Sequence, residues 1–373
     1  MKNIGLIVNP IAGMGGRVGL KGTDGFNIQQ QAISLGATSE AKYRAFETLN
    51  VLSSSSSIFK LTTCSREMGE YPALKAGFKP ELVYSMASGP STGNDTRIAA
   101  SKMQEIGVDL LLFVGGDGTA RDICDEIGED ILTLGVPSGV KIQSGVFAVT
   151  PKSAGHIVRS FIDGEITETY LRKVIDVDES NLNNDVICST HYGFLKVPND
   201  NTRIQLGKTA TLISQIESLS SLSESFVNQI DNNLTYIIGP GRTTESIMDF
   251  MGIDNTLLGV DVIKGKELLA KDVSEQDILN IVDLEKTKIV LTIIGNQGHI
   301  LGRGNQQISP QVIRAVGFDN FIVIAAKNKL LQLKNRPLLV DTGDPDLDMD
   351  LGGYIKVFTD YGEHSVHRIS NPV

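Results

Sequence analysis

Residues 110–127, LLLFVGGDGTARDICDEI, decide the fold that we expect for this chain. The apolar run at residues 110–114 predicts a strand buried on both faces. After the glycine turn GGDGT at residues 115–119, Ile123 and Ile127 fall on one face of a predicted helix. When a strand, a glycine turn and a helix follow in this order, backbone N–H groups at the helix start can meet phosphate oxygens. The segment therefore predicts one βα unit of an α/β domain with an anion-binding turn.

The large polar group of this turn is Asp117, and the glycines around it leave room for a ligand to approach the backbone. We expect Thr119 to cap the following helix through its hydroxyl. Gly-Asp-Gly is also ordinary turn chemistry that many βα loops contain without a ligand. Spacing alone therefore leaves both a phosphate-binding turn and a plain turn open.

The composition is that of a globular protein with room for two domains. The chain has 373 residues, of which 41% are hydrophobic and 21% are charged. A formal net charge of −10 argues against binding to a nucleic-acid backbone, but it leaves a locally positive site for a small anion open. The three cysteines have no metal or redox spacing, and no apolar run has the length of a signal peptide or a membrane helix. We expect a cytoplasmic protein with free thiols that binds neither nucleic acid nor a membrane.

A second glycine-rich loop, at residues 9–25, follows a predicted first strand at residues 4–8. It differs from the dinucleotide fingerprint because Val18 stands where the third glycine is required. The loop is either a flexible surface loop or a segment that wraps a ligand. We favour the second interpretation because Arg17 and Lys21 would supply positive charge to an anionic ligand.

The alternation of strand and helix patterns from residue 4 to residue 136 predicts a doubly wound parallel sheet of the Rossmann or flavodoxin type. Ligands of such sheets bind at the carboxyl ends of the strands. The predicted loops at this edge begin at Asn9, Gly89, Gly115 and Pro137.

The pattern changes beyond about residue 145. We expect an N-terminal α/β domain at residues 1–145 and an α+β domain with much β-structure at residues 146–335. A C-terminal segment follows at residues 336–373, and its return to the N-terminal domain is one of two options. Within the second domain, a strand at residues 234–238 leads into GPGRTT at residues 239–244. This is a second strand–glycine–helix unit, and its Arg and Thr side chains suit an oxyanion or phosphate.

Other chemistries fit the sequence less well. Residues 89–93 match the G-x-S-x-G elbow of serine hydrolases weakly, because we expect the next helix to begin only at Asp95 or Thr96. The sequence contains no Walker A loop, and its histidines have no metal spacing. Aspartates alternate at residues 344–350, but a calcium loop requires a glycine at its sixth position, so we predict a solvated acidic loop. Phosphoryl chemistry would therefore depend on carboxylates, glycine backbone and a recruited metal ion.

The turn at residues 115–119 resembles the GGDGT signature of NAD kinases and of diacylglycerol and sphingosine kinases, and as GGDG that of phosphofructokinases. Four further segments are similar to the ATP-NAD kinase-like family, which includes the acetoin-catabolism X proteins. They are NPIAGMGG at residues 9–16, PSGVK at 137–141, GPGRTT at 239–244 and GRGNQQ at 302–307. The resemblance extends to about Tyr361, and the combination of motifs is much more specific than GGDGT alone.

The resemblance implies an α/β N-terminal domain, a second domain rich in β-structure and a nucleotide bound between them. It implies transfer of the γ-phosphoryl group of ATP, with polyphosphate as an alternative donor, to the 2′-hydroxyl of the adenosine ribose of NAD. Asp117 would be the catalytic residue, as a base, as a hydrogen-bond partner of the hydroxyl or as a ligand of Mg²⁺. An ordinary Asp pKa of about 4 favours positioning over proton abstraction. A homo-oligomer is expected from the resemblance alone.

The other candidate residues would bind the nucleotide or its phosphates. They are Asn9, Pro10, Gly13, Gly15, Gly16, Gly115, Gly116, Gly118, Thr119, Pro137, Gly139, Lys141, Gly239, Gly241, Arg242 and Thr243.

The chain departs from well-characterised NAD kinases in its second half. A segment resembling T-P-T-G-S-T-A-Y and an Asn-Glu pair between the domains are both missing, and residues 239–244 are a distant counterpart of the former. This departure concerns the acceptor more than the donor. Two alternatives therefore stay open, namely a kinase of another small-molecule or lipid acceptor and a nucleotide-binding regulator without catalysis.

Overall fold

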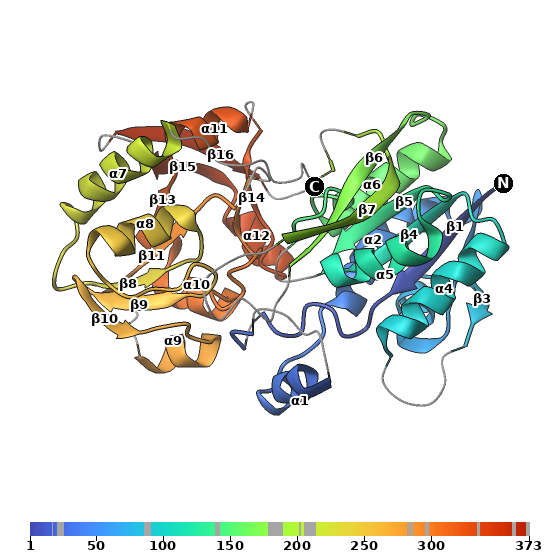
Figure 1. Ribbon diagram of the computed structural model, residues 1–373, viewed down its shortest axis with the longest axis horizontal. Helices are drawn as coiled ribbons and strands as arrows, with labels where there is room; N and C mark the ends of the chain where they lie inside the picture. The colour runs from blue at the N-terminus through green and yellow to red at the C-terminus, as the bar shows by residue number, and fades with distance from the viewer. Residues whose placement is uncertain are drawn as a thin grey trace. The chain divides into compact units, whose positions relative to one another are not determined.

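The computed structural model of the chain falls into two compact units, each with its own sheet (Figure 1). The first unit comprises Met1–Met14 and Gly22–Gly207, and the second comprises Gly15–Lys21 and Lys208–Val373. The structure describes residues 1–16, 18–20, 26–85, 91–138, 142–177, 189–200, 203–204, 214–281, 283, 286–294, 298–333, 336–359 and 363–370.

A five-stranded parallel sheet forms the centre of the first unit, in the order β3-β2-β1-β4-β5. Its strands are β1 (Lys2–Val8), β2 (Phe59–Cys64), β3 (Glu81–Tyr84), β4 (Leu110–Gly115) and β5 (Thr133–Pro137). Every residue of β4 is buried, as its continuous apolar run predicts. The doubly wound parallel sheet is thereby confirmed. Because the strand order runs one way from β1 and the other way from β4, the topological switch point lies between these two strands.

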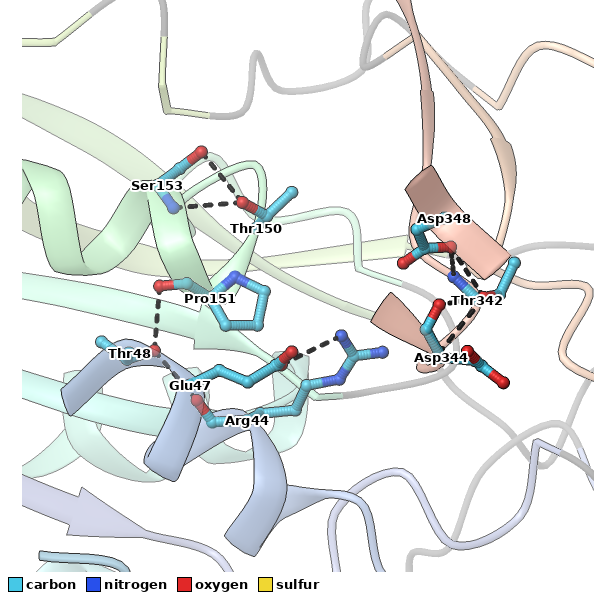
Figure 2. A network of polar contacts seen from close by, with 9 residues as sticks. All are labelled: Arg44, Glu47, Thr48, Thr150, Pro151, Ser153, Thr342, Asp344 and Asp348. Carbon is cyan, nitrogen blue, oxygen red and sulfur yellow. Dashed lines mark hydrogen bonds and ion pairs between the residues drawn. The ribbon is translucent and has the colours of Figure 1, made fainter. Parts of the chain in front are cut away.

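Helices cover this sheet in two pairs, in which α2 packs against α6 and α4 packs against α5. The helices of this unit are α1 (Phe26–Ser34), α2 (Ala41–Leu52), α3 (Glu70–Lys75), α4 (Gly93–Glu105), α5 (Asp117–Ile127) and α6 (Pro151–Ile162), with short 3₁₀ turns at Ser53–Ser55 and Arg66–Met68. Figure 2 shows how α2 and α6 are joined, since the Thr48 hydroxyl donates to the carbonyl of Pro151 at 2.9 Å. Thr150 caps α6 by accepting the N–H of Ser153 at 3.1 Å.

The first unit extends well beyond the predicted boundary at residue 145. Strands β6 (Thr169–Val177) and β7 (Ser189–Pro198) form an antiparallel ribbon that packs on α5. Val174 and Val197 of this ribbon are buried in the core of the first unit. The change of pattern near residue 145 is therefore a change from parallel sheet to ribbon within one unit, and residues 146–207 do not start the second unit.

A nine-stranded mixed sheet forms the second unit, in the order β10-β9-β8-β11-β13-β15-β16-β14-β12. The strands are β8 (Thr235–Ile238), β9 (Asp261–Lys264), β10 (Glu267–Ala270), β11 (Thr287–Thr292), β12 (His299–Leu301), β13 (Phe321–Ile324), β14 (Leu338–Val340), β15 (Gly353–Phe358) and β16 (His364–Ser370). Neighbours from β8 through β11 and β13 to β15 pair in parallel. Side chains alternate between two cores, since Ile237 belongs to one and Tyr236 and Ile238 belong to the other.

The helices of the second unit are α7 (Ser214–Val227), α8 (Arg242–Phe250), α9 (Glu275–Ile281), α10 (Pro310–Val316), α11 (Lys327–Gln332) and α12 (Pro345–Asp350), with a 3₁₀ turn at Phe318–Asn320. The segment at residues 336–373 stays in this unit and does not return to the first, because β14, β15 and β16 are all strands of its sheet. Val357 and Ile369 are buried in its core.

The acidic segment at residues 344–350 forms the N-cap and the whole of helix α12 rather than a solvated loop. Asp344 caps α12 by accepting the N–H of Leu347 at 3.0 Å. The buried carboxylate of Asp348 accepts the N–H of Thr342 at 2.9 Å and its hydroxyl at 2.7 Å (Figure 2). Asp344 and Asp348 therefore stabilise the turn at the start of α12.

Candidate functional site

The glycine turn lies where strand β4 ends and helix α5 begins. Gly116 is the N-cap of α5 and Asp117 is its first residue, so the partial positive charge of the helix start lies beside a carboxylate. A Cβ atom at Gly115 would lie 2.3 Å from the Oγ1 atom of Thr119, which leaves no room for a side chain. The strand–glycine–helix geometry predicted from the sequence is thereby observed.

The expected role of Thr119 as the helix cap is wrong, because this residue is the third in α5. Its hydroxyl instead accepts a hydrogen bond from the side-chain amide of Asn9 at 2.9 Å. The Asn9 backbone N–H also bonds to the carbonyl of Val114 at 2.9 Å. The loop after β1 is thus tied to the glycine turn after β4, across the topological switch point.

Asp117 is 7% exposed, and both oxygens of its carboxylate accept backbone hydrogen bonds. The N–H of Gln143 lies 2.7 Å from Oδ2, and the N–H of Ser144 lies 3.1 Å from Oδ1. These donors lie in the segment that follows β5. The two N–H groups therefore fix the orientation of the Asp117 carboxylate.

The loop after β5 approaches the loop after β1 closely. Pro137, the last residue of β5, is paired with Gly115 in the sheet. Gly13 has a φ of +79°, and a Cβ atom there would lie 2.2 Å from the carbonyl oxygen of Ser138. Asn9, Pro10, Gly13, Pro137 and residues 115–119 are therefore gathered at one edge of the sheet, as expected. The candidates Gly139 and Lys141 lie outside the described residues.

A second helix begins close to α5, at Gly93. Thr92 is its N-cap and Asp95 completes a capping box, so the helix begins before the predicted Asp95 or Thr96. The Tyr84 hydroxyl donates to Asp95 at 2.6 Å. On α5, Asp122 accepts from Arg97 of α4 at 2.6 Å, which fixes the two helices to each other.

Gly15 and Gly16 fall in a different unit from the earlier candidates of their loop. They belong to the second unit, while the loop up to Met14 belongs to the first. A Cβ atom at Gly16 would lie 3.0 Å from the side-chain amide carbon of Gln306. Gly16 therefore packs against the GRGNQQ segment within the second unit.

The second strand–glycine–helix unit is also observed. Strand β8 ends at Ile238, and α8 begins at Arg242 after the N-cap Gly241, which has a φ of +137°. Gly239 donates its N–H to the carbonyl of Val290 at 2.8 Å. Arg242 is exposed and Thr243 is buried. All four candidates of this turn belong to the second unit.

The donors to Asp117 are the functional groups that the sequence does not reveal. Gln143 and Ser144 act through backbone N–H groups, which every residue except proline possesses. The one sequence signal for this segment is its position, because it follows Pro137 at the end of the strand that pairs with β4.

Two family models match the chain. The ATP-NAD kinase N-terminal domain matches residues 4–166, and the ATP-NAD kinase C-terminal domain matches residues 231–369. Together the two matches cover well over half of the sequence, and the chain belongs to the ATP-NAD kinase family.

No curated protein matches the sequence. One similar solved structure is described as that of "a putative diacylglycerol kinase from Bacillus anthracis str. Sterne", with 12% sequence identity and a TM-score of 0.23. The match covers 63% of this chain and 59% of that protein, so the chain spans less than two thirds of its length. A TM-score this low supports no argument about activity. None of the helices that the structure describes has the length and apolar character of a membrane span.

Proposed function

We propose that the chain transfers the γ-phosphoryl group of ATP to the 2′-hydroxyl of the adenosine ribose of NAD, which gives NADP and ADP. The observation that supports this most is the oriented, buried carboxylate of Asp117 at the first residue of α5. The match to both ATP-NAD kinase domains supports the same reaction class.

The glycine turn supplies the phosphate contacts in this proposal. The first N–H groups of an α-helix have no partner within the helix, and the helix dipole favours an anion there. Gly115, Gly116 and Gly118 keep side-chain bulk away from that backbone. The Asn9 side chain, bonded to Thr119, fixes the neighbouring loop beside the phosphates. The turn at Gly239, Gly241, Arg242 and Thr243 is a second candidate for phosphate contacts, within the second unit.

Asp117 positions the acceptor hydroxyl. In the reaction, a bond forms between the acceptor oxygen and the γ-phosphorus as the bond to the ADP oxygen breaks. Phosphoryl transfer depends mainly on positioning and charge neutralisation. An aspartate with its ordinary pKa of about 4 is a weak base, so we propose that Asp117 orients the hydroxyl more than it removes its proton.

The residues of the turn are compatible with magnesium. In kinases Mg²⁺ is commonly held by one or two carboxylates together with substrate phosphates, and it neutralises the charge of those phosphates. In this proposal the Asp117 carboxylate, at the first residue of α5, would contribute one ligand. Within the described ranges, no three His, Cys, Asp or Glu side chains gather as a metal site, so the phosphates would supply the other ligands.

The acceptor is tested by incubating the protein with Mg²⁺, a donor and a panel of alcohols while ADP release is followed. The donors are ATP and polyphosphate, and the acceptors are NAD, other nucleosides, small polyols and a diacylglycerol. We expect turnover with ATP and NAD. Turnover with another acceptor but not with NAD would overturn the proposed substrate. A rise in melting temperature with ATP or NAD and no turnover with any acceptor would identify a nucleotide-binding regulator instead.

A further inference from the structure

A short segment of the loop after β1 belongs to the second unit, although the chain on both sides of it belongs to the first. The first unit is interrupted after Met14 and resumes at Gly22, while Gly15–Lys21 falls in the second unit. The segment turns back on itself, since Leu20 donates its N–H to the carbonyl of Gly15 at 2.9 Å. It therefore forms a turn of the second unit that is inserted into the loop after β1.

This turn packs against two other parts of the second unit. Gly16 is buried, and a Cβ atom there would lie 3.0 Å from Cδ and 3.1 Å from Oε1 of Gln306. A Cβ atom at Gly19 would lie 3.8 Å from the carbonyl oxygen of Asp272, an ordinary van der Waals distance. Among the described residues, the buried Oε1 atom of Gln306 has no hydrogen-bond partner. The contact between Gly16 and Gln306 is therefore the tighter of the two.

The backbone on both sides of Gln306 is fixed by its neighbour Asn305, which is 2% exposed. The Asn305 side chain accepts the N–H of Gly302 at 2.9 Å and donates to the carbonyl of Ile300 at 2.9 Å. Its backbone carbonyl accepts the N–H of Ile308 at 3.0 Å. The loop after β12 therefore holds Gln306 at a defined place in the second unit.

Three residues before Gly16, the same loop is fixed within the first unit. A Cβ atom at Gly13 would lie 2.2 Å from the carbonyl oxygen of Ser138. Earlier in the loop, the Asn9 side chain donates to Thr119 at 2.9 Å. Even fully extended, three residues span only about 10 Å. The chain between Gly13 and Gly16 is therefore too short to absorb a displacement of Gly16 without passing part of it to the preceding loop.

We propose that Gln306 is a positioning residue for phosphoryl transfer, because its packing on Gly16 holds the loop after β1 where that loop meets the phosphates of the nucleotide. Gln306 acts through Gly16 and touches neither substrate. The inference rests on the proposed function, which assigns this loop to the phosphates. A positioning role predicts weaker nucleotide binding with little change in the chemical step, since both N–H donors to Asp117 belong to the first unit.

The test is a double-mutant cycle in the full chain, with Gly16→Ala, Gln306→Ala and the combination of the two. Gly16 has no positive φ, so alanine adds a methyl group against Gln306 without left-handed backbone strain. Gln306→Ala removes Cδ and Oε1, the two atoms nearest to that methyl group. Residues in contact give non-additive effects, so the two substitutions should compensate each other in the combined variant.

Calorimetry measures the affinity for ADP, and steady-state kinetics with ATP and NAD give kcat and the KM for ATP. We expect each single variant to weaken ADP binding and raise the KM by about three- to tenfold, with kcat within about twofold of the wild type. The combined variant should bind ADP more tightly than either single variant. Melting temperatures show whether a variant has also lost stability.

Gly352→Ala and Gln311→Ala are the matched controls within the second unit. A Cβ atom at Gly352 would lie 3.0 Å from the carbonyl oxygen of Met349, which matches the crowding at Gly16. Gln311 is an exposed glutamine of α10. Both controls should leave the ADP affinity and the KM for ATP unchanged.

Weak ADP binding in Gly16→Ala beside unchanged binding in Gln306→Ala would show that Gly16 meets the nucleotide without help from Gln306, and would overturn the inference. Additive losses in the combined variant would overturn it too, and so would lower melting temperatures with unchanged ADP affinity. In each case a wild-type chain that converts NAD leaves the proposed function standing. A wild-type chain that binds ADP without turnover would overturn the proposed function alone, because the cycle is still measured by ADP affinity. Absence of ADP binding by the wild-type chain would overturn both.

Discussion

The backbone N–H of Gln143 donates to the carboxylate of Asp117 at 2.7 Å, which ties the first residue of α5 to the segment after β5. A second N–H, from Ser144, binds the other oxygen at 3.1 Å. Asp117 therefore joins the glycine turn before α5 to the segment after β5. This structural role is additional to the role that we propose for it in phosphoryl transfer. The two roles are separable by experiment.

Replacing Asp117 with asparagine should reduce turnover by about 10², as is typical for a positioned acid–base group, and should largely spare nucleotide affinity. An asparagine side chain has one oxygen for two N–H donors, so we also expect the free energy of unfolding to fall by about 1–3 kcal/mol. Steady-state kinetics, calorimetry with ADP and urea unfolding measure the three quantities.

Asp122→Asn is the matched control, because this carboxylate is equally buried on the same helix but pairs with Arg97. It should lower stability and leave kcat within about twofold, well below the loss typical of a catalytic group. Unchanged turnover in Asp117→Asn would remove Asp117 from the mechanism. An equal loss of kcat in both variants would reduce its role to stability.

The bond between Asn9 and Thr119 is tested by Thr119→Val, which removes the acceptor for the Asn9 amide. A loop held less firmly should bind the nucleotide less well, so we expect KM for ATP to rise by about three- to tenfold, the equivalent of one hydrogen bond of about 1 kcal/mol. Thr119→Ser keeps the hydroxyl and should behave like the wild type. If serine and valine raise KM equally, the methyl contact and not the hydrogen bond positions the loop.

Part of the architecture follows from local sequence patterns. The apolar run at residues 110–114 specified a buried strand, and the glycines at residues 115–118 marked the turn, because both properties depend on neighbouring residues alone. The parallel order of the strands then placed Asn9 and Pro137 beside that turn.

Other features depend on contacts between distant residues. The partners of Asp117 are backbone groups without a side-chain signature. The ribbon at residues 169–198 belongs to the first unit because Val174 and Val197 fill its core, which no local pattern reveals. Likewise, the packing of Gly16 against Gln306 becomes visible only when the chain is folded.

The hydrogen bond from Tyr84 to Asp95 predicts a pH-dependent contribution to stability. Burial acts to raise the pKa of Asp95, but bonds from Tyr84 and Thr92 outweigh it and hold the pKa below its usual value. The bond to Asp95, together with burial and nearby negative charge, raises the pKa of Tyr84 to about 12. The carboxylate therefore stabilises the fold above its ordinary pKa of about 4, and the phenol does so below its ordinary pKa of about 10.

Tyr84→Phe should lower the free energy of unfolding by about 1 kcal/mol at pH 7, because it removes one hydrogen bond to a partly exposed group. The difference from the wild type should shrink as the pH falls below about 4, where Asp95 takes up a proton, and as it rises from about 10 towards 12, where Tyr84 loses one. Urea unfolding over this pH range measures it. The exposed Tyr71, changed to phenylalanine, is the control and should give no comparable difference. A difference that is constant from pH 3 to pH 7 would contradict the role of the Asp95 bond.

Substitutions at Gly13 and Gly36 test the close approach between the loop after β1 and the loop after β5. Both have a φ of +79°, but only Gly13 has a neighbour, the carbonyl oxygen of Ser138. Gly36→Ala should therefore cost only the left-handed backbone strain of about 1–2 kcal/mol. Gly13→Ala should cost more, because its Cβ would lie 2.2 Å from that oxygen and one loop has to move. Since the displaced loop contains Asn9, we also expect weaker binding of ADP in Gly13→Ala alone. If Gly13→Ala and Gly36→Ala lose equal stability in urea unfolding and bind ADP equally well, the contact between Gly13 and Ser138 does not position the loops after β1 and β5.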